Sequence, residues 1–145
     1  MNTSEQQAAK ATEIVLVVEA DVLLRLSIAA YLRDCGYRVI EAAHAEEAVL
    51  VLKQPSLDVD VLFSDVEMPG AMDGFALAQW TRANRPGLDI ILTGSVPGAV
   101  NAAHTLCDDG PMPKPYEPQA VHDRIRRLLA ARPPRPPKGA PHEDS

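Results

Sequence analysis

Short, unbroken apolar runs alternate with longer segments of mixed polarity along most of this chain. The first run, Ile14–Val18, contains no polar residue, which is typical of a strand covered on both faces. In the segment that follows, apolar residues recur every three or four positions, so we expect a helix that is capped by Asp21 and continues to about Asp34. Gly36 then ends it, because glycine readily adopts the left-handed conformation found just after helices.

The same alternation continues to residue 131. Strands are predicted over 37–41, 59–64 and 88–92 and around Met112, and helices over 45–53 and 75–84, within 99–106, and from about Pro118 onwards. Strands and helices in alternation indicate βαβ units and a parallel sheet. Because a closed eight-stranded barrel needs about 250 residues, we predict an α/β fold with an open, doubly wound sheet of five strands and five helices.

The two ends of the sequence depart from this pattern. Residues 1–12 are expected to be a mobile lead. Prolines crowd the stretch 132–145, which includes the sequence Pro-Pro-Arg-Pro-Pro, so we expect a disordered Pro/Arg-rich tail there. The folded domain is therefore predicted to span residues 13–131.

Composition narrows the class of protein. The 145 residues suffice for one domain, and apolar residues make up 46% of them, as in an ordinary soluble core. A formal net charge of −6 argues against nucleic acid or an anionic membrane as the partner. No apolar stretch approaches the roughly 18 residues that span a bilayer. Since Cys35 and Cys107 also show no paired spacing, we expect a cytoplasmic protein with free thiols.

Polar residues directly follow four of the predicted strands. They are Glu19 after the first strand, Asp65 after the third, Thr93 after the fourth and Lys114 after the fifth. The carboxyl ends of parallel strands meet at one edge of the sheet, where doubly wound folds bind their ligands. We therefore expect all four side chains at that edge.

Two carboxylates at one edge suit a hard divalent cation such as Mg²⁺, which takes oxygen ligands and keeps several waters. Asp21 and Glu67 lie close by in the sequence and add further carboxylates. A cation, a lysine ammonium and a hydroxyl around one carboxylate are what phosphoryl transfer onto that carboxylate requires. The pattern therefore predicts that Asp65 is a nucleophile.

Five short motifs occur in a fixed order along the chain. They are Val15-Leu-Val-Val-Glu19, Ser64-Asp-Val-Glu-Met-Pro-Gly70, Met72-Asp-Gly74, Ile90-Ile-Leu-Thr-Gly94 and Pro113-Lys-Pro-Tyr116. As a set they resemble the receiver domain of bacterial two-component response regulators, over about residues 13–131. The resemblance implies a flavodoxin-like fold with the strand order 2-1-3-4-5, in a stand-alone receiver similar to the chemotaxis regulators.

The resemblance also implies roles for the residues at the strand ends. Asp65 corresponds to the residue that accepts the phosphoryl group, Thr93 to the hydroxyl that closes on this group, and Lys114 to its charge partner. The peptide bond between Lys114 and Pro115 is expected to be cis, which an X-Pro bond permits at low cost.

The magnesium ligands that the resemblance implies are Glu19, Asp65 and the backbone or side chain of Glu67, with Asp21 as a further candidate. Two positions depart from the family pattern. The second of the family's two adjacent acidic residues is replaced by Ala20, so we expect weaker Mg²⁺ binding. Pro111 stands where many receivers carry a Tyr or Phe that turns inward with the switch hydroxyl.

These observations favour a phosphorelay signalling protein over an enzyme. We expect it to accept a phosphoryl group from a histidine kinase or phosphotransfer protein and then to change its affinity for a downstream protein, as a monomer or weak homodimer. Ala20 and Pro111 favour one alternative, a pseudo-receiver that binds proteins without being phosphorylated. A phosphatase is disfavoured, because no Cys or Ser nucleophile lies in a phosphate-cradling loop.

Overall fold

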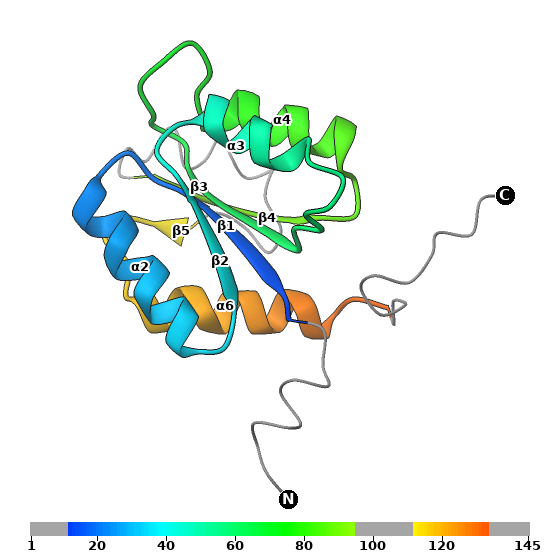
Figure 1. The fold of residues 1–145 in the computed structure, drawn as a ribbon. Coiled ribbons are helices and arrows are strands. Elements are labelled where there is room, and N and C mark those ends of the chain that lie inside the picture. Colours follow the sequence, from blue (N-terminus) through cyan, green and yellow to red (C-terminus); the bar gives the residue numbers. More distant parts are fainter. Residues whose placement is uncertain (1–11, 95–111, 134–145) are drawn as a thin grey trace, which may run out of the picture.

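The sheet at the centre of the molecule contains five parallel strands in the order β2-β1-β3-β4-β5 (Figure 1). The strands are β1 (Ile14–Val18), β2 (Arg38–Ala42), β3 (Val61–Asp65), β4 (Asp89–Gly94) and β5 (Met112–Pro113). The structure is a computed structural model that describes residues 12–94 and 112–133. The strand order reverses at β1, so the predicted open, doubly wound topology is confirmed.

Helices cover both faces of this sheet (Figure 1). The helices are α2 (Val22–Asp34), α3 (Ala45–Leu52), α4 (Gly74–Asn84) and α6 (Pro118–Ala130). α2 packs beside α6 on one face, and α3 packs beside α4 on the other. These are four of the five predicted helices; the one expected within 99–106 lies outside the described residues.

The core has two halves, one on each face of the sheet. Alternate residues of the central strands point to opposite faces, so Leu16, Leu62 and Ile90 pack under α3 and α4. Val17, Phe63 and Ile91 pack instead under α2 and α6. All five residues of β1 are buried, as its unbroken apolar run predicts. All five residues of β3 are buried as well, although its last two, Ser64 and Asp65, are polar.

Local side-chain contacts set the ends of several elements. The Asp21 carboxylate accepts a hydrogen bond from the backbone N–H of Leu24 and so caps α2, as predicted. Gly36, with a φ of 104°, turns the chain after α2. The strand predicted over 59–64 begins at Val61, because its ladder with β1 starts there, and it extends to Asp65.

The amino-terminal end of the sheet carries a buried ion cluster. The Asp60 side chain is completely buried, and one of its oxygens accepts a hydrogen bond from the N–H of Ile14 at 2.8 Å. Arg132 lies 3.3 Å from its other oxygen and 2.6 Å from Asp89, and it also donates to the Asp60 carbonyl. Residue 132, the first position of the predicted tail, is thus anchored to the starts of β3 and β4.

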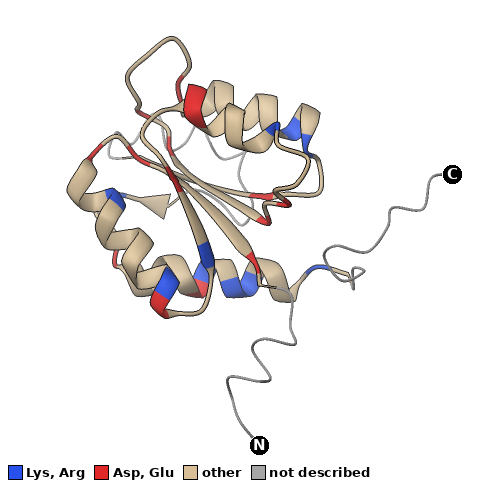
Figure 2. Ribbon diagram, in the orientation of Figure 1, with Lys and Arg blue, Asp and Glu red and all other residues tan. Residues whose placement is uncertain are grey.

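Acidic residues occur at both ends of the central strands (Figure 2).

Across the part of the chain that the structure describes, no helix combines the length and the apolar character needed to cross a membrane.

Candidate functional site

The four polar residues predicted at the strand ends lie at the carboxyl-terminal edge of the sheet. Glu19 directly follows β1, Asp65 is the last residue of β3, Thr93 is the fifth residue of β4, and Lys114 directly follows β5. β1 and β3 are neighbours whose chains continue to opposite faces of the sheet, the arrangement at which doubly wound folds bind ligands. The topology therefore brings residues from four separate strands to one place.

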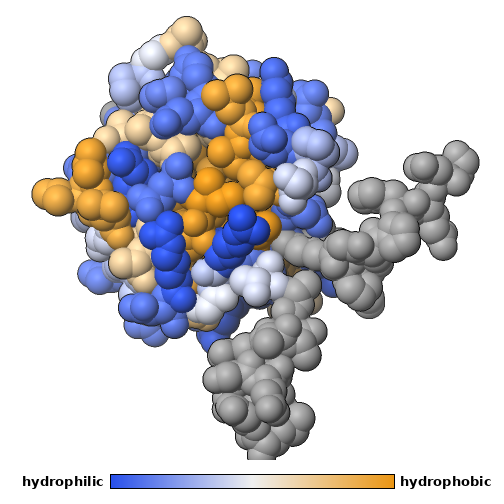
Figure 3. Space-filling model, viewed as in Figure 1, coloured by the Kyte–Doolittle hydropathy of each residue, from blue (hydrophilic) through white to orange (hydrophobic). Residues whose placement is uncertain are grey.

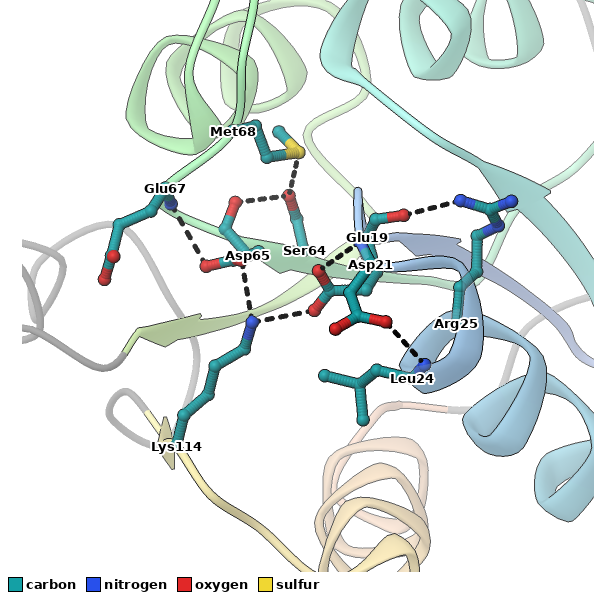
Figure 4. A network of polar contacts seen from close by, with 9 residues as sticks. All are labelled: Glu19, Asp21, Leu24, Arg25, Ser64, Asp65, Glu67, Met68 and Lys114. Carbon is teal, nitrogen blue, oxygen red and sulfur yellow. Dashed lines mark hydrogen bonds and ion pairs between the residues drawn. The ribbon is translucent and has the colours of Figure 1, made fainter.

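Lys114 joins the two carboxylates. Its Nζ donates hydrogen bonds of 2.8 Å to Glu19 Oε1 and of 2.8 Å to Asp65 Oδ2 (Figure 4). The exposed fractions of the Glu19 and Asp65 side chains are only 4% and 7%. We call these three residues the strand-end cluster; with one cation and two anions, it keeps a formal negative charge.

The two carboxylates stabilise the protonated form of Lys114. Partial burial by itself lowers the pKa of the ammonium, but the hydrogen bonds and negative charges of Asp65 and Glu19 outweigh burial and raise this pKa above its ordinary value of 10.5. Lys114 is therefore a permanent cation at neutral pH.

Asp65 is held by the chain on both sides of it. Its Oδ1 accepts a hydrogen bond of 3.1 Å from the backbone N–H of Glu67, while its Oδ2 faces Lys114. The hydroxyl of Ser64 donates to the Asp65 carbonyl oxygen at 3.0 Å. The Asp65 carboxylate thus has a fixed orientation before any ligand arrives.

Glu19 is held in a similar way. Its Oε2 accepts a hydrogen bond of 3.0 Å from the backbone N–H of Asp21, and its carbonyl oxygen accepts one of 2.8 Å from the Arg25 guanidinium. Arg25 also lies 3.4 Å from Glu41 on the edge strand β2. Sequence patterns did not single out Arg25, because an arginine on a helix ordinarily extends into solvent.

Thr93 carries a buried hydroxyl beside Asp65. Thr93 pairs with Asp65 in the register of β3 and β4, and its carbonyl accepts a hydrogen bond of 2.8 Å from the Val66 N–H. Its Oγ1, however, is buried and has no hydrogen-bond partner within the described residues. Such an atom beside a carboxylate is a donor available to a ligand.

Two predicted metal ligands have other roles in this structure. One oxygen of Asp21 is engaged as the cap of α2. The side chain of Glu67 is exposed and points away from the strand-end cluster, while its backbone N–H binds Asp65 (Figure 4). The structure therefore brings together Glu19, Asp65 and Lys114, but it does not add these two carboxylates to them.

The fit of the site to Mg²⁺ follows from this donor set. Within residues 12–94 and 112–133, no three side chains of His, Cys, Asp or Glu are grouped closely enough to hold a metal ion. Glu19 and Asp65 do lie together, and Mg²⁺ is commonly held by one or two carboxylates with waters and phosphate oxygens. The site thus suits a Mg²⁺ ion with two carboxylate ligands, and Ala20 provides no third.

Two further predictions concern the fifth strand. The Lys114–Pro115 peptide bond is cis, as expected. Pro111 lies outside the described residues. Tyr116, two residues after Lys114, has a buried hydroxyl without a hydrogen-bond partner in residues 12–94 and 112–133, which no sequence pattern indicated.

Comparisons with known proteins agree with this geometry. The chain is 30% identical over 132 residues to the sensor kinase CckA of Brucella abortus, with 86% of this chain and 14% of that protein covered. It is 34% identical over 119 residues to the probable transcriptional regulator ycf27 of Pyropia yezoensis, with coverages of 81% and 47%. The chain therefore spans less than half the length of these relatives.

Solved structures show the same fold. The receiver domain protein from Methanospirillum hungatei is 22% identical, with a TM-score of 0.75, over 83% of this chain and 95% of that one. The response regulator TrrA from Thermotoga maritima, solved in complex with Mg²⁺-BeF, is 24% identical, with a TM-score of 0.71, over 81% of this chain and all of that one. The profile of the response regulator receiver domain matches residues 15–126. With the fold, the strand-end cluster and this match in agreement, the chain belongs to the response regulator receiver domain family.

Proposed function

We propose that this receiver domain accepts a phosphoryl group on Asp65 from a histidine kinase or phosphotransfer protein, and that this changes its affinity for a protein partner. The observation that supports this most directly is the surroundings of the Asp65 carboxylate. It is oriented by Lys114 and by the Glu67 N–H, and it lies beside the Thr93 hydroxyl, which has no partner in the part of the chain that the structure describes. An oriented nucleophile, a cation and a spare donor are the elements of a phosphoryl acceptor site.

In the proposed reaction an Asp65 carboxylate oxygen attacks phosphorus. The bond from phosphorus to the imidazole nitrogen of the donor breaks, and its electron pair returns to that nitrogen. Lys114 stays protonated and moves its hydrogen bonds onto the phosphoryl oxygens. The acyl phosphate carries about −1.5 to −2 charge at neutral pH.

Glu19 and Asp65 are the residues that would hold Mg²⁺. When bound, the ion neutralises charge on the phosphoryl oxygens during transfer. Because Ala20 supplies no oxygen ligand and Lys114 already shares both carboxylates, we expect weaker binding than a third carboxylate would allow.

Thr93 is the proposed switch residue. Its buried hydroxyl gains a hydrogen bond when the phosphoryl group provides an acceptor, and this favours the conformation in which β4 closes on the site. The difference in free energy between the two conformations is the signal that a partner protein reads.

The phosphodonor protein is proposed to approach over the start of α2. Three apolar side chains are exposed there, a few residues after Glu19: Val22 by 54%, Leu23 by 79% and Leu26 by 50%. The space-filling view shows an apolar patch at the edge of the molecule, over the start of α2 (Figure 3). Exposed apolar residues of this size commonly mark contact surfaces.

The pseudo-receiver remains the second candidate, and one observation favours it. Lys114 already neutralises part of the charge on Glu19 and Asp65, so the two carboxylates are held together without a metal ion or a phosphoryl group. In that case the α2 surface would bind partners in the resting conformation alone.

The two candidates differ in whether Asp65 reacts. The test is the intact mass after incubation with acetyl phosphate or phosphoramidate, with and without Mg²⁺, and with Asp65→Asn as the matched control. A Mg²⁺-dependent gain of one phosphoryl group that is lost in Asp65→Asn is expected. If no group is gained but Ala20→Asp restores the gain, the second candidate is correct.

A further inference from the structure

The ring of Tyr116 lies in the core just beneath the phosphoacceptor site. It packs edge-on against Phe63, with a centroid distance of 5.5 Å and an interplanar angle of 86°. Phe63 precedes Asp65 by two residues in β3, and Tyr116 follows Lys114 by two residues. The phenol is therefore linked to Lys114 by a short stretch of chain and to the strand of Asp65 by its packing on Phe63.

The hydroxyl of Tyr116 contributes no hydrogen bond to the described part of the resting structure. It is buried and has no hydrogen-bond partner within the described residues. A buried polar atom without a partner lowers stability, so such atoms are rare and often belong to functional sites. Thr93, the other residue with such an atom, already has a proposed ligand.

The negative charges in and near the strand-end cluster act on this hydroxyl. Burial raises the pKa of the Tyr116 phenol, and the negative charges of Glu19, Asp65 and Asp21 raise it further. The phenol therefore keeps its proton throughout the physiological range. It is a neutral donor among anions.

Phosphorylation would change the hydrogen bonds that Glu19 accepts. In the resting state, Glu19 Oε1 accepts its hydrogen bond from Lys114, and Oε2 accepts from the Asp21 N–H. If Lys114 turns to a phosphoryl group on Asp65, Glu19 Oε1 loses this donor while it stays buried. Each carboxylate oxygen has two acceptor sites, so a new donor is compatible with a bound cation.

We propose that Tyr116 is a positioning residue of the phosphorylated state: its hydroxyl donates to Glu19 when Lys114 leaves Glu19 for the phosphoryl group. This inference rests on the proposed function. It gives the Tyr116 hydroxyl a function in the phosphorylated state only. Removing the hydroxyl should therefore weaken the phosphorylated state and leave the resting state intact.

The test compares Tyr116→Phe with wild type and with Tyr31→Phe, a matched loss of a hydroxyl from the same half of the core. One measurement is the free energy of unfolding in urea without ligand. The other is the affinity for beryllofluoride with Mg²⁺, the phosphoryl mimic, by calorimetry. For Tyr116→Phe we expect unchanged or higher resting stability and an affinity about tenfold lower, as for the loss of one hydrogen bond to a charged group. Tyr31→Phe should leave the affinity unchanged.

Two results would overturn the inference while the proposed function stands. One is a Tyr116→Phe variant that binds beryllofluoride as tightly as wild type. The other is a variant whose resting stability falls as well, which would show a structural role. If wild type neither binds beryllofluoride nor gains mass from acetyl phosphate, the proposed function itself fails and the inference falls with it.

Discussion

The backbone of Gly74, at the start of α4, lies directly against the carbonyl oxygen of Asp65. A β-carbon on Gly74 would stand 2.2 Å from that oxygen and 2.5 Å from the α-carbon of Val66. Both neighbours are backbone atoms, so neither can move away by a change of side-chain rotamer. The first turn of α4 therefore packs onto the proposed nucleophile, and position 74 has room for hydrogen alone.

Gly74→Ala should lower the free energy of unfolding by about 1–3 kcal/mol, as overpacking typically does. It should also displace Asp65 from Lys114 and slow phosphorylation by acetyl phosphate. Gly87→Ala is the control, since a β-carbon there meets nothing within 4 Å. Urea denaturation and intact mass measure the two effects. Equal stability of the two variants would contradict the close approach.

Lys114→Met should lower the free energy of unfolding by about 3 kcal/mol, because two buried carboxylates lose their shared cation. Lys53→Met, which changes an exposed lysine after α3, is the matched control. The pKa of Lys114 is raised in the folded state above its ordinary value of 10.5. Its stabilisation is therefore complete below about pH 10.5 and is lost as the pH rises through the raised pKa. Denaturation curves from neutral to alkaline pH measure the difference between wild type and Lys114→Met. A difference that disappears well below pH 10 would argue against this ion pair.

Ala20→Asp should raise the affinity for Mg²⁺ about tenfold, because it adds a carboxylate ligand beside Glu19. Without metal the same substitution should lower the melting temperature, since a further negative charge joins two others. Ala30→Asp adds the same charge on the exposed face of α2 and should change neither quantity in this way. Calorimetric titration with Mg²⁺ and thermal unfolding measure the effects. Equal Mg²⁺ affinities in both variants would show that position 20 does not face the ion.

Arg132→Gln should destabilise the fold by about 3 kcal/mol, because the buried Asp60 carboxylate loses its guanidinium. Arg126→Gln removes a side chain that is 65% exposed, and it should change stability by less than about 1 kcal/mol. Urea denaturation of both variants checks the difference. Matching midpoints would mean that residue 132 belongs to the tail after all.

His122 should titrate below its ordinary pKa of 6.5. Its ring lies edge-on to Tyr37 at 5.4 Å and to Tyr31 at 6.5 Å, and burial, followed by the charge of Arg126, lowers its pKa. A lowered pKa means that the folded state favours neutral histidine, so stability is lost as the pH falls below about 6.5. Imidazole resonances in an NMR titration report the value. Arg126→Gln should raise it, and Asp123→Asn should lower it further. A value at or above 6.5 in wild type would refute this assignment.

The strands and most helices were predictable because the apolar residues of the helices recur at a regular spacing and the central strands contain continuous apolar runs. β1 is apolar throughout and reads directly as a buried strand, and the polar residues at the carboxyl ends of β1, β3, β4 and β5 could be aligned from the expected topology. Strand ends were less accurate. Val59 and Leu88 are buried before their ladders begin, so apolarity overestimates how early β3 and β4 start.

The details of the site required coordinates. Sequence spacing placed Glu19 and Lys114 at one edge, but it did not show that Lys114 bonds to both carboxylates. Glu67 was expected to offer its backbone or its side chain to the metal; the side chain points outward, and its N–H donates to Asp65, so only its backbone carbonyl stays a predicted ligand. The Tyr116 hydroxyl was not foreseen, because only packing in three dimensions reveals that a polar atom lacks a partner.

Arg132 also determines where the chain leaves the domain. Its guanidinium is bound to the starts of β3 and β4, while Asp65 lies at the far end of β3, about 17 Å away along a five-residue strand. A segment joined after residue 133 would thus be tethered to the end of the sheet opposite the proposed phosphoacceptor. We expect a fluorophore or fused reporter placed there to keep its orientation when Asp65 is phosphorylated, and so to serve as a stationary reference for distance measurements.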